Sequence, residues 1–339
     1  LDANSRISLS NNDSGGTGGE DSTSGNTILG YLSGAAIASG GLNNTTIGHK
    51  AGNAISTADN NVFIGALAGS THLTGGRNTA IGSQAMFNTD EDSDSNSSIS
   101  NVFIGAQAGG GTWAGETSNH NIGIGDLALG GALAGGDGTV AIGSSALKAL
   151  TSGARNMAIG YTAGGLITDG TDNTLIGYQS GNQGTYGIVG GDYNTGVGAY
   201  SMGASAGAAI TGSSNTAIGY NAMLEAQGAV ADNTAVGSGA LQNITTATKN
   251  IAIGTLALST NTGGGDNIAI GYHAAKLGED NTGFQNNIAI GNYALDGSTG
   301  ESLSECVAIG YAAMSGAVTA AADGSTAVGY TALNALTSG

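Results

Sequence analysis

A ten-residue phrase that recurs along the chain constrains its fold more than any other feature of the sequence. The phrase reads KNIAIGTLAL at 249–258, DNIAIGYHAA at 266–275 and NNIAIGNYAL at 286–295. Seventeen copies align on its glycine, and consecutive copies are 17 to 23 residues apart. A short period of this kind predicts a solenoid in which each copy forms one coil. The repeat glycines are Gly30, Gly48, Gly65, Gly82, Gly105, Gly125, Gly143, Gly160, Gly177, Gly198, Gly219, Gly237, Gly254, Gly271, Gly291, Gly310 and Gly329.

The position four residues before each repeat glycine is nearly always asparagine. Fourteen of the seventeen copies have Asn there, and the exceptions are Thr139, Cys306 and Ser325. Because stacked amides can bond to the equivalent amide one coil away, we predict a structural ladder along the solenoid. Its members are Asn26, Asn44, Asn61, Asn78, Asn101, Asn121, Asn156, Asn173, Asn194, Asn215, Asn233, Asn250, Asn267 and Asn287.

The three residues between this column and the repeat glycine have the composition of a β-strand. The first is Thr, Ile or Val except at Met157, and the third is always aliphatic. β-Branched residues at this density predict a strand whose middle residue, most often Ala, points to the opposite face. Both faces of the strand are therefore largely apolar. Ala or Ser stands three residues after every repeat glycine, and we predict a second short strand there.

These columns predict an all-β fold, a parallel β-solenoid with two short strands and a loop in each coil of 17 to 18 residues. One continuous roll of seventeen repeats is expected over 26–339, after an N-terminal lead-in or cap at 1–25. One coil is too thin to bury both apolar faces of its strand, so we expect further copies of the chain to cover one face. Cyclic symmetry is usual for such a homo-oligomer, but the residues alone do not choose between two and three chains.

The composition fits this fold and excludes several classes of partner. The 339 residues include 64 glycines and no proline, and few large side chains are available for a wide core. With 7 Lys and Arg against 24 Asp and Glu, the formal charge of −17 argues against nucleic acid and anionic lipid as partners. No apolar run is long enough to span a bilayer, so we expect no membrane insertion. The start, LDANSRISLS, lacks Met and a signal-like apolar core, which suggests a fragment or a processed product.

The phrases NTAIGYNAM at 215–223 and NTAVGSGAL at 233–241 resemble the head repeats of YadA-like trimeric autotransporter adhesins, and similar phrases are common in bacteriophage tail-fibre shafts. The resemblance covers roughly residues 26–335 and depends on the Asn, Ile-Gly and Ala columns. It implies a left-handed parallel β-roll that assembles as a homotrimer. The period is longer than that of the adhesins because a loop is added to each coil, and the looped form is more similar to the phage shafts.

One acidic loop is a candidate cation site. The longest insertion, FNTDEDSDSNSSIS at 87–100, contains Asp90, Asp92 and Asp94, whose carboxylates could hold Ca²⁺. It lacks the residue order and the terminal Glu of an EF-hand, so a solvated acidic loop is the favoured interpretation. The phrase GGGDNIAIG at 263–271 is similar to a Ca²⁺-binding nonapeptide but does not recur every nine residues. We predict no other metal and no cofactor.

The remaining reactive side chains show no pattern of a site. Cys306 occupies the asparagine column, where a buried and unreactive thiol is expected. The histidines have no metal-ligand spacing and are assigned no role; they are His49, His72, His120 and His273.

Aromatic residues offer candidate glycan contacts. Nine of the eleven tyrosines stand one or two residues after a repeat glycine, so we expect them along one edge of the solenoid. Amphipathic rings suit sugar binding, whereas stacking on the next coil is the more ordinary role. Trp113 is the better candidate because no repeat column requires it, with local packing as the equal alternative. The candidate glycan-binding residues are Trp113, Tyr161, Tyr178 and Tyr220.

Seventeen near-equivalent coils without a catalytic constellation favour a structural and adhesive fibre segment over an enzyme. β-Helix acyltransferases carry three hexapeptide phrases per coil where this chain has one, and no carboxylate pair can be nominated for glycoside hydrolysis. An ice-binding face is disfavoured because Thr follows the asparagine column in only eight copies.

The resemblance favours a bacteriophage tail-fibre shaft, extracellular and part of the virion, that positions receptor-binding parts for host attachment. The alternative is a bacterial trimeric surface adhesin head that binds host or matrix ligands. The expected partners are sister chains and a cell-surface glycan or protein receptor.

Overall fold

The chain divides into two compact units, Leu1–Tyr161 and Thr162–Gly339. The predicted lead-in at 1–25 lies outside the described residues except for Gly25, and the continuity of one roll over 26–339 stays a prediction. The computed structural model describes residues 25–37, 41–89, 97–113, 116–183, 186–204, 207–276, 283–297, 303–316 and 322–335.

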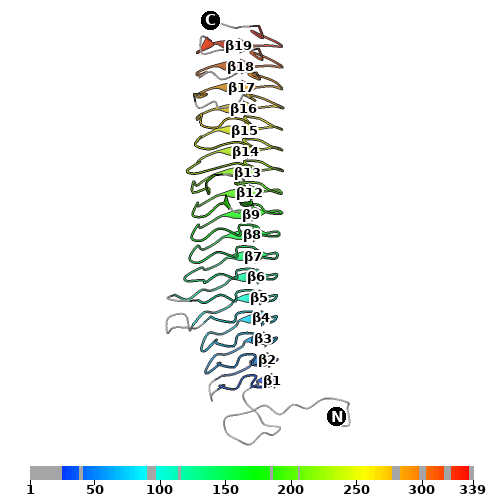
Figure 1. Cartoon of the computed structure of the whole chain (residues 1–339), viewed down its shortest axis with the longest axis vertical. Helices are drawn as coiled ribbons and strands as arrows, with labels where there is room; N and C mark the ends of the chain where they lie inside the picture. The colour runs from blue at the N-terminus through cyan, green and yellow to red at the C-terminus, as the bar shows by residue number, and fades with distance from the viewer. Residues whose placement is uncertain are drawn as a thin grey trace, which may run out of the picture. The chain divides into compact units, whose positions relative to one another are not determined.

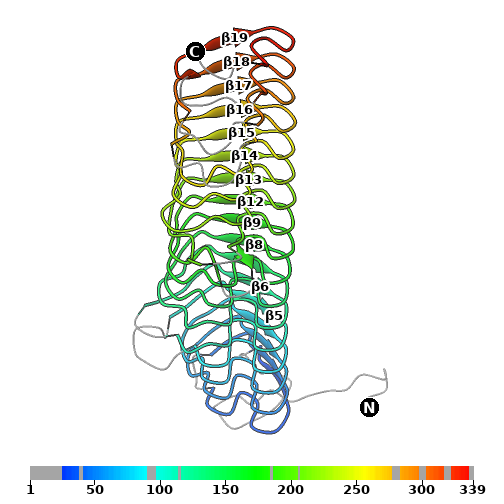
Figure 2. The same cartoon turned by 45° about the horizontal axis from the view of Figure 1, so that its top comes forward.

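Each unit is a stack of coils built on one parallel sheet, and successive strands lie directly over one another within a unit (Figures 1 and 2). The described residues contain no α-helix, so the chain is an all-β solenoid, as predicted. The strands of the first unit are β1 (Thr27–Leu29), β2 (Thr45–Ile47), β3 (Val62–Ile64), β4 (Thr79–Ile81), β5 (Val102–Ile104), β6 (Ile122–Ile124), β7 (Val140–Ile142) and β8 (Met157–Ile159). Those of the second are β9 (Thr174–Ile176), β12 (Thr195–Val197), β13 (Thr216–Ile218), β14 (Thr234–Val236), β15 (Ile251–Ile253), β16 (Ile268–Ile270), β17 (Ile288–Ile290), β18 (Val307–Ile309) and β19 (Thr326–Val328).

The parallel strands pair in the register that alignment on the repeat glycine predicts. In β13 and β14, Thr216 is opposite Thr234, and in β15 and β16, Ile253 is opposite Ile270. Each column therefore pairs with itself along the sheet of its unit. A separate antiparallel pair, β10 (Asn182–Gln183) and β11 (Tyr186–Gly187), lies in the loop before β12.

The middle residue of each strand points into the coil, and its two neighbours point outward. In β15, Ala252 is fully buried, whereas Ile251 is 38% and Ile253 is 40% exposed. The small inward residue is required because the interior of one coil is only a few side chains wide. Buried alanines after the repeat glycine and aliphatic side chains from the loops, such as Ile244, complete this narrow core.

The inward strand residue is matched in size to the residue four places after the repeat glycine. In the coil of Phe63 that residue is Gly69, and a Cβ placed there would lie 2.7 Å from the Phe63 ring. Where the strand instead contributes Ala141, the same place holds the fully buried Leu147. Large and small residues exchange places in most coils, although Ala158 is paired with Gly164 and Ala269 with Ala275.

The predicted second strand is wrong. The residues after the repeat glycine form consecutive turns, because every second one is left-handed: after Gly65, Leu67 has φ 62° and Gly69 has φ 55°. Left-handed residues cannot continue an extended backbone. The turns still bond from coil to coil, since the Gly69 N–H donates to the Ala85 carbonyl at 2.9 Å. Each coil therefore has one three-residue strand, and backbone hydrogen bonds join the coils on the turn side as well.

Candidate functional site

The asparagine column forms an amide ladder within each unit. The Oδ1 atom of Asn233 accepts hydrogen bonds from the backbone N–H of Asn250 at 3.0 Å and from its Nδ2 at 3.2 Å. The same Nδ2 also donates to the carbonyl of Gly264, in the loop before the next strand, at 2.9 Å. All fourteen asparagines are buried. Their hydrogen bonds join each strand to the neighbouring strand and to a loop, so their role is structural.

Two exceptions in this column behave differently. The Thr139 N–H donates to Oδ1 of Asn121 at 2.9 Å, but Thr139 Oγ1 and Asn121 Nδ2 are buried without a hydrogen-bond partner in the described part of the chain. The buried thiol of Cys306 donates to the carbonyls of Ser304 and Ala322 at 3.4 and 3.3 Å. Burial raises the pKa of this thiol, which favours its neutral and unreactive form.

The repeat glycines bring the backbones of adjacent coils into contact. Their φ angles lie between 129° and 143°, and a Cβ on Gly237 would be 2.6 Å from the carbonyl oxygen of Gly254 in the next coil. No side chain fits between coils at this column. The residues immediately before and after each repeat glycine reach the surface instead, once in every coil.

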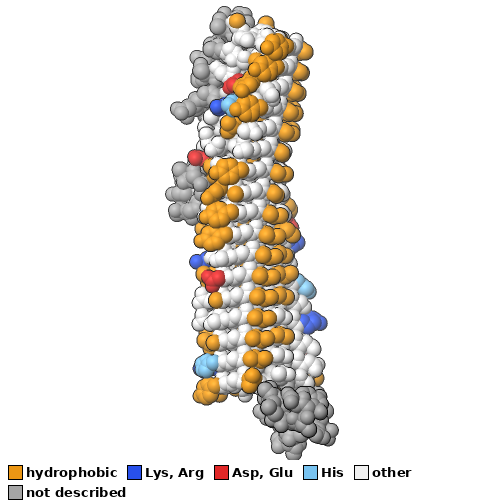
Figure 3. All heavy atoms as spheres, turned by 90° about the vertical axis from the view of Figure 1, so that its right-hand side faces the viewer, with side chains coloured by type: hydrophobic (Ala, Val, Ile, Leu, Met, Phe, Trp, Pro, Cys, Tyr) orange, Lys and Arg blue, Asp and Glu red, His pale blue; other side chains and the backbone are white. Residues whose placement is uncertain are grey.

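The outward residues of the strands form an apolar surface, which we call the aliphatic face. Figure 3, viewed from the strand side, shows its hydrophobic side chains as a column. The face contains Thr, Val, Ile, Leu and Met but no charged residue. Soluble monomers rarely expose so extended an apolar surface, so the face is suited to being covered. Its most exposed members are Leu29, Ile104, Ile124 and Met157 in the first unit, and Ile218, Ile251, Ile253, Ile270, Ile309 and Val328 in the second.

The structure does not support Trp113 as a glycan contact. Its side chain is fully buried, and its ring packs edge-on against Phe103 with the centroids 5.7 Å apart. The local-packing alternative is therefore the correct one, because a buried ring cannot stack on a sugar. The indole Nε1 has no hydrogen-bond partner among the residues that the structure describes.

The three candidate tyrosines are all exposed, and two of them belong to one cluster. Tyr161 is 51%, Tyr178 is 47% and Tyr220 is 56% exposed. Tyr178 and Tyr220 lie on either side of Tyr200, which contacts both edge-on at centroid distances of 5.3 and 6.1 Å. The candidate residues did not include Tyr200, although it too follows a repeat glycine, by two residues. The Tyr178 and Tyr220 rings contact Tyr200 on the coil between them and remain accessible.

A larger group of rings, which we call the aromatic cluster, consists of Tyr272, His273, Tyr293, Tyr311 and Tyr330 on four consecutive coils. The Tyr272 and His273 rings are stacked, with centroids 4.1 Å apart, and Tyr293 lies 5.4 Å from Tyr272. Tyr311 is 5.8 Å from Tyr293 and 5.4 Å from Tyr330. None of these residues is among the candidates predicted from the sequence, although their place after the repeat glycine is a signal that the sequence contains.

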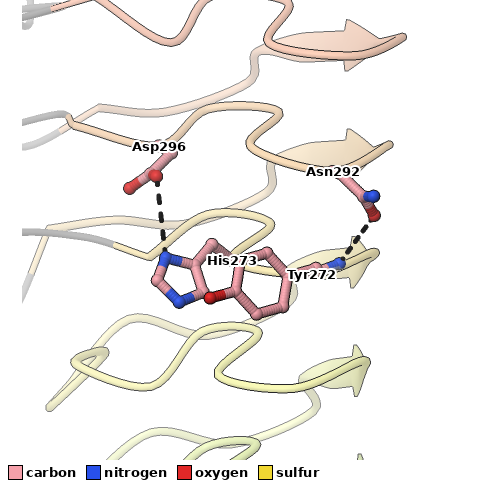
Figure 4. A network of polar contacts seen from close by, with 4 residues as sticks. All are labelled: Tyr272, His273, Asn292 and Asp296. Atoms are coloured by element: carbon pink, nitrogen blue, oxygen red, sulfur yellow. Dashed lines mark hydrogen bonds and ion pairs between the residues drawn. The ribbon is translucent and has the colours of Figure 1, made fainter.

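Polar groups surround one end of the aromatic cluster (Figure 4). The Asn292 side-chain oxygen accepts the Tyr272 backbone N–H at 3.0 Å, and His273 Nδ1 is 3.9 Å from Asp296 Oδ2. Burial, with a smaller contribution from Lys276, lowers the pKa of His273 below its ordinary value, so the imidazole is neutral at pH 7. Burial raises the pKa of the Asp296 carboxyl.

The candidate cation ligands Asp90, Asp92 and Asp94 lie outside the described residues. Within the described ranges, no three His, Cys, Asp or Glu side chains gather into a group that could hold a metal ion. His72 is buried and bonds through Nε2 to the Gly75 carbonyl at 2.7 Å, which is a packing role.

The fold and these surfaces define a β-solenoid repeat protein with an uncovered aliphatic face and clustered exposed tyrosines. The sequence matches no protein-family model, and comparison with curated proteins gives no match either. Among the described residues, no helix has the length and apolar character that crossing a membrane requires.

Proposed function

We propose that the chain is a segment of a homotrimeric extracellular fibre, with the aliphatic face of each protomer turned toward the trimer axis. The observation that carries the proposal is the repetition of this uncharged, outward-facing column on every three-residue strand of both units. A closed assembly in which the same face of each chain meets its copies would remove that surface from water. Three chains and the left-handed course of the roll come from the resemblance to adhesin and tail-fibre repeats.

The free energy gained by covering the aliphatic face adds up over many coils. Ile253 and Ile270 pair in neighbouring strands and are 40% and 36% exposed, so each coil leaves a fraction of an aliphatic side chain in water. Burial of apolar area contributes about 25 cal/mol per Å². A small gain per coil adds up along the sheet, because each coil contributes the same column of side chains.

The fibre's role is to position receptor-binding parts for host attachment, and a bacteriophage tail-fibre shaft is the version we favour. The loop added to each coil supports it, because the looped repeat is more similar to phage shafts than to adhesin heads. The alternative is a bacterial surface adhesin head. The coding sequence on either side of this segment distinguishes them, since a virion-attachment or chaperone domain fits the first and an outer-membrane anchor fits the second.

Sedimentation velocity and negative-stain electron microscopy of the purified chain test the proposal together. A mass of three chains and thin rigid rods are the expected results. A monomer that stays soluble with the aliphatic face in water would overturn it. Loss of a polysaccharide substrate on incubation with the protein would contradict a purely structural and adhesive role.

A further inference from the structure

The aromatic cluster is a local feature, in contrast to the aliphatic face. Two coils of the same unit that precede it carry Ser238 and Thr255 in the place where the cluster has Tyr272, Tyr311 and Tyr330. Those coils keep the same strand pairing and the same backbone contacts as the others. Coil stacking therefore does not require a ring there, and an interface repeated along the chain does not require one either.

The rings of the cluster are accessible and carry polar edges. Tyr272 is 42%, Tyr311 is 47% and Tyr330 is 77% exposed, and each presents an aromatic surface beside a phenol hydroxyl. The coil of Tyr293 adds the side-chain amide of Asn292 and the carboxylate of Asp296 beside Tyr272 and His273. A surface that alternates aromatic rings with hydroxyl, amide and carboxylate groups matches a chain of pyranose rings, which alternate C–H faces with hydroxyl groups.

The charge of the chain restricts the class of glycan. With a formal charge of −17, the protein repels acidic polysaccharides at neutral pH. Burial, followed by the nearby Lys276, lowers the pKa of His273 and so disfavours its charged form. An uncharged sugar chain avoids this repulsion and uses the ring faces and hydrogen-bonding groups that are present.

We propose that the aromatic cluster binds a neutral polysaccharide, with sugar rings lying on Tyr272, Tyr311 and Tyr330. The inference deepens the proposed adhesive function, on which it rests, by assigning a ligand class to one place on the fibre. Rings spaced one coil apart place contacts along one direction of the solenoid, so an extended polymer gains several weak contacts at once.

Affinity electrophoresis of the full chain in gels containing dextran, galactomannan or hydroxyethyl cellulose tests this proposal. At least one of these neutral polymers is expected to retard the protein. The double variant Tyr311→Ser with Tyr330→Ser should bind on the order of tenfold more weakly, because two stacking surfaces are lost. Phenylalanine at both positions keeps the rings and should retain most of the binding.

The matched control is Tyr31→Ser, since Tyr31 also follows a repeat glycine and is 69% exposed but lies outside the cluster. It should bind as the wild type does. The proposal is overturned if none of the three polymers retards the wild type, if the control or the phenylalanine variant loses binding equally, or if only polygalacturonate binds. Dissociation of the oligomer by the serine variant would also overturn it, because the rings would then be contacts between chains. A wild-type trimer that binds no glycan leaves the fibre proposal standing.

Discussion

An asparagine in the ladder serves three hydrogen-bonding partners at once, and this explains why few other residues occupy the column. Its Oδ1 accepts the next asparagine's N–H and Nδ2, and its own Nδ2 donates to the preceding amide and to a loop carbonyl, as Asn233 and Asn250 show. A threonine has one hydroxyl and no amide, so it cannot reach all of these groups. At Thr139 the side-chain donor to Asn121 Oδ1 is therefore missing, and Thr139 Oγ1 has no hydrogen-bond partner among the described residues.

Thr139→Asn should therefore stabilise the first unit. The new Nδ2 would reach Oδ1 of Asn121, as Asn250 reaches Asn233, and a buried hydrogen bond contributes about 1 kcal/mol. Urea denaturation followed by circular dichroism measures the change. Thr139→Val removes the unpartnered hydroxyl without adding an amide, so it measures that part of the gain, and Thr139→Asn should be the more stable of the two. Equal urea midpoints for the wild type and Thr139→Asn would show that the interruption of the asparagine ladder at Thr139 does not destabilise the unit.

Burial of His273 makes stability depend on pH in a defined direction. Because its pKa is lowered in the folded chain, the unfolded chain takes up a proton first as the pH falls below about 6.5. Stability is fully present above that pH and is lost as the pH falls toward the folded pKa. His273→Gln should remove this loss, seen as a smaller drop in Tm between about pH 7.5 and about pH 5. The same change at His120, which is exposed, should leave the drop unchanged; an unchanged drop in His273→Gln would contradict the assignment.

At the scale of the single coil, the exchange of large and small inward residues gives a test of core packing. Phe63→Ala should cost about 3 to 5 kcal/mol, because the space that Gly69 leaves for the ring becomes a cavity. Adding Gly69→Leu should recover much of the loss, since Leu147 occupies the same place beside Ala141 with a similar left-handed φ of 48°. Thermal and urea unfolding of the single and double variants measure the recovery.

Gly69→Leu alone is the matched control for that experiment. It should destabilise the coil by overpacking against the Phe63 ring, which a Cβ would already approach to 2.7 Å. A double variant no more stable than Phe63→Ala would mean that the two positions do not share one space.

The sequence predicts the strand and fails at the turn segment for a physical reason. Thr, Val and Ile on either side of a small residue are typical of a strand, and register follows from the repeat itself. Positive φ is uncommon for residues other than glycine, so Leu67 or Met86 gives no local signal of a left-handed turn. Among the described residues, 41 residues other than glycine have a positive φ, and hydrogen bonds between coils stabilise this conformation, which local preference disfavours.

The candidate site is predictable only where it follows the repeat. The asparagine ladder follows from identical spacing, whereas Trp113 lies in a loop, where no repeat column indicates that its ring is buried. The aromatic cluster is intermediate, since the tyrosines follow the repeat glycine but their ring contacts depend on which coils are neighbours. Tyr293 stands two residues after its repeat glycine, and its ring contacts Tyr272, which stands one residue after the repeat glycine of the adjoining coil.

For the whole molecule, repeated and local features separate structural from binding roles. A surface present on every coil, such as the aliphatic face, suits assembly with identical chains, because register between copies is then kept along the full sheet. Rings on only some coils suit recognition of another molecule. The same backbone supports both, since the glycine column fixes the coil spacing regardless of the residue that follows it.

Ile253→Asp tests the assembly at this scale. The side chain points outward and is 40% exposed in the single chain, so a carboxylate there is tolerated by the isolated coil. In the proposed trimer three such charges would meet near the axis, and burying unpaired charge costs several kcal/mol. Sedimentation should show a shift from trimer to smaller species, with a lower Tm. Thr255→Asp adds the same charge to the same coil at an exposed corner and should remain trimeric with little change in Tm. If both variants sediment as trimers with wild-type melting, the aliphatic face is not the contact between chains, because a charge placed on it would have met no apolar partner.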